Sequence, residues 1–380
     1  MDDKIYVNQI NKKNIKTILN LMINRKKKKI IYLIGLSLAF IIITFDDNLN
    51  NYFEYKKDND KILSKSSNKT PKNIFLFKGD DDTSINIQKI HIAMALDNNI
   101  VYPTLVSMTS ACSNNDKKKN ILVYHLLLSH NFNKSNINIL ETLKIDYLVI
   151  INYYIIPPRF SRLRKWRSGT ECIYYKLLLP LILPTVKRII YLDCDTLVYR
   201  DLSEMYNLDF HGNYVLGYPF HNPYILDKWG IRVINHINAG VILINIEKII
   251  NENKDFDLLQ YVVKNNRNLF FLEQDAINLF FHNYIGLLPL KYGIYLFGNI
   301  TIFRKKIKKN LRVQLNETEL IEAIENPAIV HCSCCYPKFW SKSTYNCFGD
   351  TFICDRFNRD FYFFAKKTKF FQKVYNLYMK

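Results

Sequence analysis

The stretch from Arg188 to Asp201, RIIYLDCDTLVYRD, constrains this chain most, because its apolar run ends on two carboxylates. The run predicts a buried strand, and Asp193 and Asp195 follow it with Cys194 between them. Strand side chains alternate between faces, so we expect both carboxylates to point one way and Cys194 the other. Two converging carboxylates at the end of a buried strand are costly unless a cation holds them. The pair therefore predicts a site for Mg²⁺ or Mn²⁺ that bridges to substrate phosphates, with two solvated acids as the alternative.

The rest of the chain alternates strand-like apolar runs with helical patterns. Strand-like runs cover residues 89–97, 121–128, 145–151, 188–193, 214–220, 239–246 and 328–331, and helical patterns cover residues 102–111, 174–179, 256–264 and 274–281. This alternation indicates an α/β fold with a mixed, mostly parallel sheet flanked by helices. Ligands bind at the carboxyl ends of strands in such sheets. Asp97, Asp193 and His331 each follow an apolar run, so we expect them at that edge.

The amino-terminal part of the chain carries a membrane-anchor signal. Residues 1–29 end in a cluster of cations, Ile30 to Phe45 form an apolar run, and Asp46 and Asp47 follow. The run is short for a spanning helix but lacks the small residues of a cleavage point, so we favour an uncleaved anchor over a cleaved signal peptide. Cations before the run and acids after it predict a cytosolic tail and a lumenal remainder, which is the topology of a single-pass type II membrane protein. A thin endoplasmic reticulum or Golgi membrane suits the short run.

Two further segments flank the predicted folded domain. Residues 46–87 are rich in Lys, Asn, Ser and Asp and are typical of a flexible stem. Residues 346–380 form a tail that mixes aromatic residues with lysine. This tail either lies on an anionic membrane surface as an amphipathic helix or packs its aromatic side chains on the domain.

The chain is strongly basic. It has 53 Lys and Arg residues against 34 acids, a net charge of +19. Such a balance favours polyanions, anionic membranes or phosphorylated substrates. The chain is also rich in Asn, Lys, Ile and Tyr, so part of the charge reflects composition, and we expect no nucleic-acid partner.

Five segments, taken together, resemble the retaining glycosyltransferases of family 8, which have the GT-A nucleotide-diphosphosugar transferase fold. They are HIAMALDNNIVYPTLVSMTSA at residues 91–111, YYKLLLPLILPTVKRIIYLDCDTLVYRDL at 174–202, HINAGVILIN at 236–245, LEQDAIN at 272–278 and IVHCSCCYPKFW at 329–340. They occur in the family's order and cover residues 88–345, the predicted catalytic domain. Five modest motifs in order are far more specific than any one alone.

The resemblance implies a role for individual residues around a UDP-sugar donor. Asp193 and Asp195 look like the DxD ligands of Mn²⁺, or Mg²⁺ in its place, and His331 like the third ligand. The remaining residues that the resemblance places around the donor are Ala95, Asp97 and Asn99 on the uridine side, Asn238, Ala239 and Gly240 along the sugar, and Lys176 and Lys338 near the phosphates.

The catalytic assignment also follows from the resemblance. Gln274 resembles the residue beneath the anomeric carbon, and Glu273 resembles its neighbour that contacts donor-sugar hydroxyls. A leaving nucleoside diphosphate develops negative charge, which a divalent ion and a lysine stabilise. Gln274 is a neutral amide and a poor nucleophile, so we prefer attack of the acceptor on the same face as the leaving group. Glu273 is the only close carboxylate that would argue for a covalent intermediate.

The chain departs from the family pattern in three places. Lys176 stands where the family commonly has Arg, which keeps the charge but loses the bidentate fork. Glu273 stands where Asp is usual, and Cys334 replaces a Gly in a loop one residue longer before Lys338.

We therefore expect retaining transfer of a hexosyl or pentosyl group from a UDP-sugar to a glycan, glycolipid or glycoprotein acceptor. The alternatives are a catalytically inactive relative that binds glycans or partners, and a self-glucosylating starter resembling glycogenin.

Overall fold

In the computed structural model, the described residues are 87–165, 169–220, 235–295, 317–332 and 351–378. They belong to the second of two compact units of the chain, Ser84–Lys380. The predicted anchor at residues 30–45, the predicted stem and Lys338 lie outside the described residues. Within the described ranges, no helix is both long enough and apolar enough to cross a membrane.

A mixed sheet of seven strands forms the centre of this unit, in the order β3-β2-β1-β4-β7-β6-β8. Its strands are β1 (Gln88–Leu96), β2 (Asn120–Ser129), β3 (Val149–Ile156), β4 (Arg188–Leu192), β6 (Val215–Pro219), β7 (Ile237–Asn245) and β8 (Ile285–Leu287). The pairs β1–β2, β2–β3, β1–β4 and β6–β8 are parallel, while β7 runs antiparallel to both β4 and β6. The expected mostly parallel sheet is confirmed.

A second, three-stranded sheet lies beside the first, in the order β5-β10-β9. Its strands are β5 (Thr196–Val198), β9 (Tyr292–Tyr295) and β10 (Ile329–His331). Strand β10 is therefore no strand of the main sheet, and the expectation that His331 ends such a strand is wrong. Residues 328–331 are too few to reveal from sequence alone which sheet they join.

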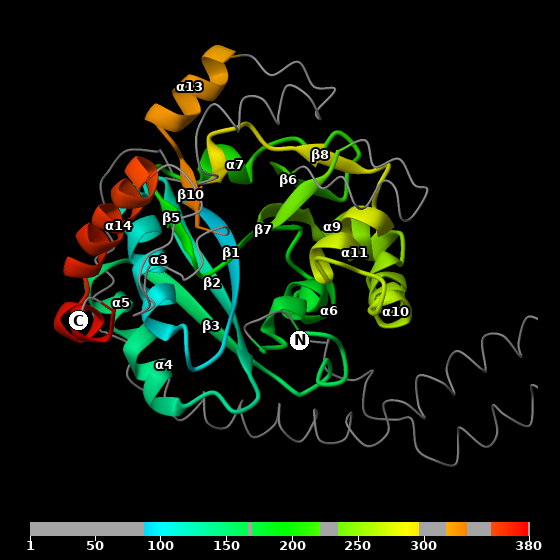
Figure 1. The fold of residues 1–380 in the computed structure, drawn as a ribbon, viewed down its shortest axis with the longest axis horizontal. Helices are drawn as coiled ribbons and strands as arrows, with labels where there is room; N and C mark the ends of the chain where they lie inside the picture. The colour runs from blue at the N-terminus through cyan, green and yellow to red at the C-terminus, as the bar shows by residue number, and fades with distance from the viewer. Residues whose placement is uncertain (1–86, 166–168, 221–234, 296–316, 333–350, 379–380) are drawn as a thin grey trace, which may run out of the picture. The chain divides into compact units, whose positions relative to one another are not determined.

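Helices flank the central sheet on both sides (Figure 1). In chain order they are α3 (Val101–Asn114), α4 (Lys134–Glu141), α5 (Leu143–Asp146), the 3₁₀ helix η1 (Cys172–Leu178), α6 (Leu179–Ile182), α7 (Ser203–Tyr206), α9 (Ile246–Asn251), α10 (Lys254–Asn265), α11 (Glu273–Phe280), α13 (Glu317–Glu325), α14 (Thr351–Lys366) and α15 (Phe371–Tyr378). Helix α3 packs against one face of the sheet, and α6, α9, α10 and α11 gather on the other side.

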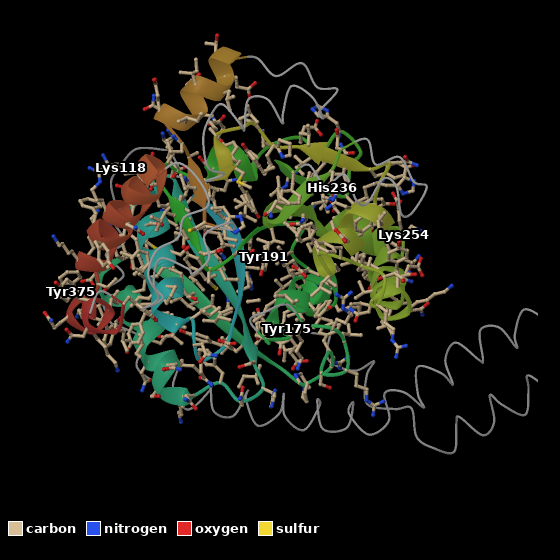
Figure 2. All side chains as sticks on the ribbon, in the orientation of Figure 1. Lys118, Tyr175, Tyr191, His236, Lys254 and Tyr375 are labelled. Carbon is tan, nitrogen blue, oxygen red and sulfur yellow. The ribbon has the colours of Figure 1, made fainter. Side chains whose placement is uncertain are left out.

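The alternation of side chains along β1 divides the core into two layers. Ile90, Ile92 and Met94 face α3, whereas Ala93 and Ala95 face η1 and α11. Tyr175 and Tyr191 fill the second layer and are almost fully buried, while Lys118 lies at the periphery (Figure 2). Two alanines on β1 leave room there for bulky tyrosines, which is how the second layer reaches close packing.

Two elements differ most from their predicted bounds. The third strand covers Val149–Ile156 rather than residues 145–151, because Leu143–Asp146 forms the short helix α5 and the apolar run continues to Pro157. The helix predicted at residues 174–179 is a 3₁₀ helix followed by α6, with Pro180 in the first turn of α6, where a missing backbone donor costs nothing.

The carboxyl-terminal tail packs on the domain. Phe361 and Phe364 of α14 and Val374 of α15 are buried, and they share one apolar cluster with Tyr102 and Val106 of α3. Of the two arrangements left open by the sequence, the structure thus contains the packing of aromatic side chains on the domain.

Candidate active site

The two acids of the DxD pattern converge through a turn. Strand β4 ends at Leu192, and Asp193 donates its backbone N–H to the Gly240 carbonyl at 2.7 Å. Cys194 and Asp195 form the turn that leads into β5. The buried Cys194 thiol points away from the acids and donates to the Ala95 carbonyl at 3.4 Å. Cys194 lies opposite to the carboxylates as expected, but a turn rather than strand alternation produces this arrangement.

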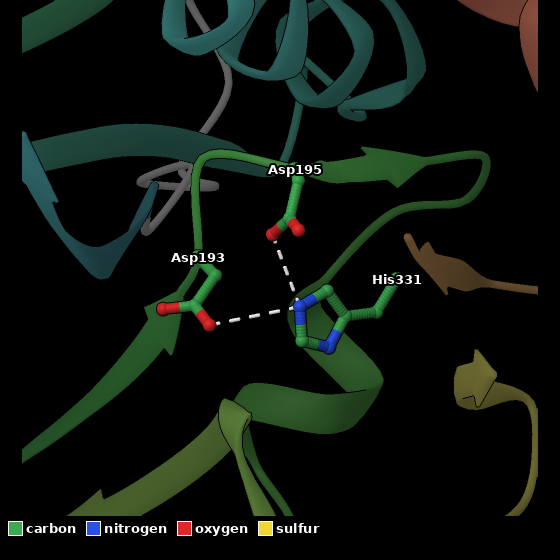
Figure 3. Close-up of side chains that lie close together, drawn as sticks. All are labelled: Asp193, Asp195 and His331. Carbon is green, nitrogen blue, oxygen red and sulfur yellow. Dashed lines mark hydrogen bonds and ion pairs between the residues drawn. The ribbon is translucent and has the colours of Figure 1, made fainter. Parts of the chain in front are cut away.

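His331 reaches the acids from the small sheet. Strand β10 pairs antiparallel with β5, which places His331 opposite Thr196. Its Nε2 lies 3.0 Å from Asp195 Oδ1 and 3.6 Å from Asp193 Oδ2 (Figure 3). The backbone N–H of Cys332 donates to the Asp195 carbonyl at 2.9 Å, which holds the two segments together.

These three side chains have the chemistry and spacing of a metal centre. Asp193, Asp195 and His331 each offer one ligand atom, and these atoms all lie within 4.8 Å of one another. Ligands about 2.1–2.3 Å from a shared ion are at most about 4.6 Å apart, so the arrangement is close to that of a bound divalent cation. Carboxylates suit Mg²⁺ and Mn²⁺, whereas an imidazole ligand is more usual on transition-metal ions.

Gly240 forms the floor beneath this cluster. A Cβ at this position would lie 2.1 Å from His331 Cε1 and 2.5 Å from Asp193 Oδ2. A side chain at this position would have to displace His331 or Asp193, so the present arrangement of the cluster depends on glycine. The resemblance had placed Gly240 only along the donor sugar. A glycine inside a strand pattern was the sequence signal for a close approach.

Gln274 lies against the segment predicted to line the donor sugar. Its Oε1 accepts hydrogen bonds from Asn238 Nδ2 at 2.9 Å and from the Ala239 backbone N–H at 3.2 Å. Asn238 Oδ1 in turn accepts from the Gly240 backbone N–H at 2.7 Å. The structure therefore brings Gln274, Asn238, Ala239 and Gly240 into one hydrogen-bonded group beside the acids.

Asn278, which the sequence analysis did not single out, fastens α11 to β7. Its Oδ1 accepts from the Ile237 backbone N–H and its Nδ2 donates to the Ile237 carbonyl, both at 2.8 Å. The β6–β7 register shifts between Gly217 and Tyr218, next to this point. A buried side-chain amide thus satisfies a backbone N–H and a backbone carbonyl beside an irregular stretch of the ladder.

The entry to α11 is conformationally unusual. Leu272, which precedes Glu273, has a backbone φ of 51°. Residues other than glycine rarely adopt this value. The carboxylate of Asp275 braces this turn by accepting from the backbone N–H groups of Phe270 and Phe271 at 2.7 and 2.8 Å. Backbone strain that the surroundings maintain in this way is typical of functional sites.

Lys176 and Glu273 form a buried ion pair between the acids and α11. Lys176 Nζ lies 3.3 Å from Glu273 Oε1, 3.5 Å from Asp193 Oδ1 and 3.0 Å from the Ala239 carbonyl. Burial opposes the charged form of Lys176, but the two carboxylates outweigh it and raise the pKa of Lys176 above its ordinary value. Burial raises the pKa of Glu273, and the Lys176 ammonium opposes that shift.

The residues predicted near the uridine lie at the end of β1. Asp97 follows this strand, is half-buried and accepts from the Asn99 backbone N–H at 2.8 Å, while the Asn99 side chain is exposed. Because β1 and β4 are parallel neighbours, Asp97 and Asp193 leave the sheet at the same edge. The contacts of Ala95 and of Lys338 with a nucleotide stay predictions, and Lys338 lies outside the described residues.

The chain has the GT-A fold of solved structures to which it is similar. The sequence model of glycosyl transferase family 8 matches residues 91–344, and the chain belongs to that family.

The chain is similar to several distant relatives. Lipopolysaccharide 1,2-glucosyltransferase of Escherichia coli is 25% identical over 225 residues, which cover 54% of this chain and 62% of that enzyme, less than two thirds of its length. General stress protein A of Bacillus subtilis strain 168 is 23% identical over 273 residues, covering 70% of this chain and 92% of that protein. The crystal structure of the galactosyltransferase LgtC, in complex with donor and acceptor sugar analogues, gives a TM-score of 0.59 at 17% identity. That likeness covers 74% of this chain and 96% of LgtC and shows a shared fold.

Proposed function

We propose that this chain is a metal-dependent retaining glycosyltransferase that moves a hexosyl or pentosyl group from a UDP-sugar to a hydroxyl of a glycan, glycolipid or glycoprotein. The observation that carries the proposal is the convergence of Asp193, Asp195 and His331 above Gly240. Beside them, Gln274 is bonded to Asn238. An ion site and a polar sugar-facing group adjacent to each other fit a donor in which a diphosphate is joined to a sugar.

Each residue of the site would have a separate role in the reaction. Asp193, Asp195 and His331 would hold the divalent ion, which when bound supplies charge stabilisation for the departing diphosphate. The two hydrogen bonds to Gln274 Oε1 fix the amide, so it can orient the sugar without becoming a nucleophile. Glu273 is paired with Lys176, which weakens it as a nucleophile. We therefore favour attack of the acceptor on the face of the leaving group, with its proton passing to a donor phosphate oxygen.

The nucleotide side of the proposal rests on the edge of β1 and on the family resemblance. Asp97 and Asn99 would contact the uridine next to Ala95, and Lys338 would contact the diphosphate. The half-buried carboxylate of Asp97 already accepts one backbone N–H and has a second oxygen for a ribose or uracil donor.

Donor hydrolysis by the full chain tests the proposal. UDP-glucose, UDP-galactose, UDP-galacturonate and UDP-xylose are offered with and without Mn²⁺, and released UDP is measured. We expect Mn²⁺-dependent release from at least one donor and a loss of at least about hundredfold in Asp195→Ala. Asp209→Ala is the matched control, because the Asp209 side chain is 73% exposed and lies in a loop away from the cluster.

An inactive binding relative gives the opposite pattern. If the chain neither binds UDP nor hydrolyses any donor, and Asp195→Ala changes nothing, the enzyme proposal fails. UDP binding without hydrolysis or transfer in all four donors would favour a binding role instead.

We also propose that residues 30–45 anchor the protein as a single-pass type II membrane protein with its catalytic domain in the Golgi or endoplasmic reticulum lumen. The support is the order of cations, apolar run and acids in the sequence. Protease added to sealed microsomes is expected to spare the catalytic domain and to remove the short basic tail. Digestion of the catalytic domain without detergent would contradict this topology and would favour a cytosolic starter enzyme.

A further inference from the structure

Lys176 is the feature that the proposed chemistry does not yet use. Its side chain is almost completely buried, with 2% of the side-chain surface exposed. A buried ammonium is tolerated only when acceptors satisfy its three N–H donors. Ala239 O, Glu273 Oε1 and Asp193 Oδ1 lie at 3.0, 3.3 and 3.5 Å, and the Tyr191 ring lies 4.5 Å from Nζ. Protein groups thus surround the ammonium, and contact with a phosphate would require breaking one of these interactions.

The four groups around the ammonium come from different parts of the site. Tyr191 lies in β4, Asp193 follows β4, Ala239 lies in β7 and Glu273 begins α11, while Lys176 itself belongs to η1. Asp193 divides its oxygens, with Oδ1 toward Lys176 and Oδ2 toward His331. The lysine therefore orients the carboxylate that faces the metal centre and also holds the first residue of the helix that carries Gln274.

We propose that Lys176 is a positioning residue that couples the metal-binding carboxylate of Asp193 to the placement of α11, and that Lys176 and Glu273 are a length-matched pair. This inference rests on the proposed function. The two residues are 97 positions apart in the sequence but in direct contact.

The pairing gives one physical reason for two departures from the family pattern. A lysine in place of arginine loses the wide bidentate fork. A glutamate in place of aspartate extends by one methylene toward the lysine. Both substitutions lie at the contact between Lys176 and Glu273. The longer Glu273 side chain restores the contact that is lost when lysine replaces arginine. Lys176 therefore stays paired with Glu273 and can still orient Asp193.

A double-mutant cycle on the full chain tests the length matching. The variants are Lys176→Arg, Glu273→Asp and the double variant, and the measurement is kcat and KM for Mn²⁺-dependent UDP-sugar hydrolysis. We expect each single variant to lose about tenfold or more in kcat/KM and the double variant to recover most of that loss, because contacting residues are not additive. A double variant whose loss equals the product of the two single losses would overturn the matched pair.

A second measurement needs no turnover. Lys176→Met keeps the length and removes the charge, and Mn²⁺ alone is titrated with the free ion followed by electron paramagnetic resonance. We expect affinity to fall about tenfold or more, as when a group that orients a metal ligand is removed. Unchanged Mn²⁺ affinity would overturn the positioning role, and a separate rise in the KM for the donor would point to direct contact with the diphosphate.

Two controls keep the outcomes distinct. Circular dichroism reports whether Lys176→Met folds. If Lys176→Met does not fold, Glu273→Gln is titrated instead, because it keeps the size of the side chain and removes the partner charge. We expect the same fall in Mn²⁺ affinity. If the unsubstituted chain binds no Mn²⁺ and hydrolyses no donor, the proposed function fails. If the unsubstituted chain binds Mn²⁺ and hydrolyses a donor, and the variants have the same Mn²⁺ affinity and activity, only the positioning role fails.

Discussion

Gly240 shows how one backbone position limits the proposed metal centre. The closest contacts of a Cβ placed there are a carbon of His331 and an oxygen of Asp193. Any side chain would push at least one ligand away, whereas glycine lets β7 pass directly beneath both. Its backbone N–H and carbonyl are also engaged, by Asn238 Oδ1 and by the Asp193 backbone N–H.

Gly240→Ala should therefore weaken the proposed ion site while the fold persists. We expect Mn²⁺ affinity to fall at least about tenfold, because the added methyl group displaces His331 or Asp193. Val241→Ala is the matched control in the same strand, since it removes buried methyl groups and costs about 2 kcal/mol without touching the ligands. Mn²⁺ titration and a urea unfolding curve separate the two effects. Equal Mn²⁺ affinity in Gly240→Ala and the unsubstituted chain would contradict the assigned role.

At the scale of elements, a polar row crosses the three parallel strands β1, β2 and β3. His91 Nδ1 lies 2.9 Å from His125 Nε2, and His125 Nδ1 lies 3.1 Å from the Tyr154 hydroxyl. The two imidazole rings stack with centroids 5.2 Å apart. Burial, and then the charge of His91, lowers the pKa of His125 to about 4, so the neutral ring is the folded form.

This row predicts a loss of stability at mildly acidic pH. The unfolded chain binds a proton at His125 near the ordinary histidine pKa of about 6.5, and the folded chain only near about 4. The contribution of neutral His125 to the free energy of unfolding is complete above about pH 6.5 and declines as the pH falls toward about 4. Between pH 7.5 and pH 5, the free energy of unfolding therefore falls by about 2 kcal/mol. Urea unfolding at both pH values measures it.

His125→Gln should flatten this pH dependence. His130→Gln is the comparison variant, because the His130 side chain is 51% exposed and lies outside this row. The same decline in His125→Gln as in the unsubstituted chain would show that other groups cause it.

Helix α14 illustrates how one element divides its aromatic residues between core and solvent. Phe361 and Phe364 are 1% and 3% exposed and pack with Tyr102 and Val106, whereas Phe363 is 56% exposed. Lys367 covers part of the Phe363 ring, with Nζ 4.5 Å from its centroid.

Phe361→Ala should lower the free energy of unfolding by about 3–5 kcal/mol through lost burial and a residual cavity. Phe363→Ala, two positions away on the same helix, should change it by no more than about 0.5 kcal/mol. Urea midpoints of the two variants measure the difference. Similar midpoints would contradict the packing of α14 on α3.

At the scale of the whole molecule, the proposed site links folding to ligand binding. The ligands of the ion come from the β4–β5 turn and from β10, so they converge only in the folded chain. Mn²⁺ and UDP together should raise the free energy of unfolding by about 2.7 kcal/mol at a hundredfold excess over Kd. Thermal unfolding measures this as a rise in Tm, which Asp195→Ala should remove. An equal rise in Asp195→Ala would contradict binding at this site.

Most of the elements around the site, and the position of the two acids at the end of a strand, could be predicted from the sequence alone. The two acids follow an apolar run, a pattern that depends on neighbouring residues alone. The family resemblance was needed to single out His331 as a ligand and Gln274 as a residue of the sugar site. Six of the seven strands of the main sheet followed from the same runs, apart from the shift of β3 to Val149–Ile156, whereas β8 was not predicted.

How these groups meet depends on the tertiary structure. The acids converge through a turn, His331 arrives from a separate small sheet, and Asn278 fastens α11 to β7. The pairing of Lys176 with Glu273 spans 97 positions in the sequence. Local periodicity holds no information on contacts of that range, because they depend on which strands pair and on how helices pack over the sheet.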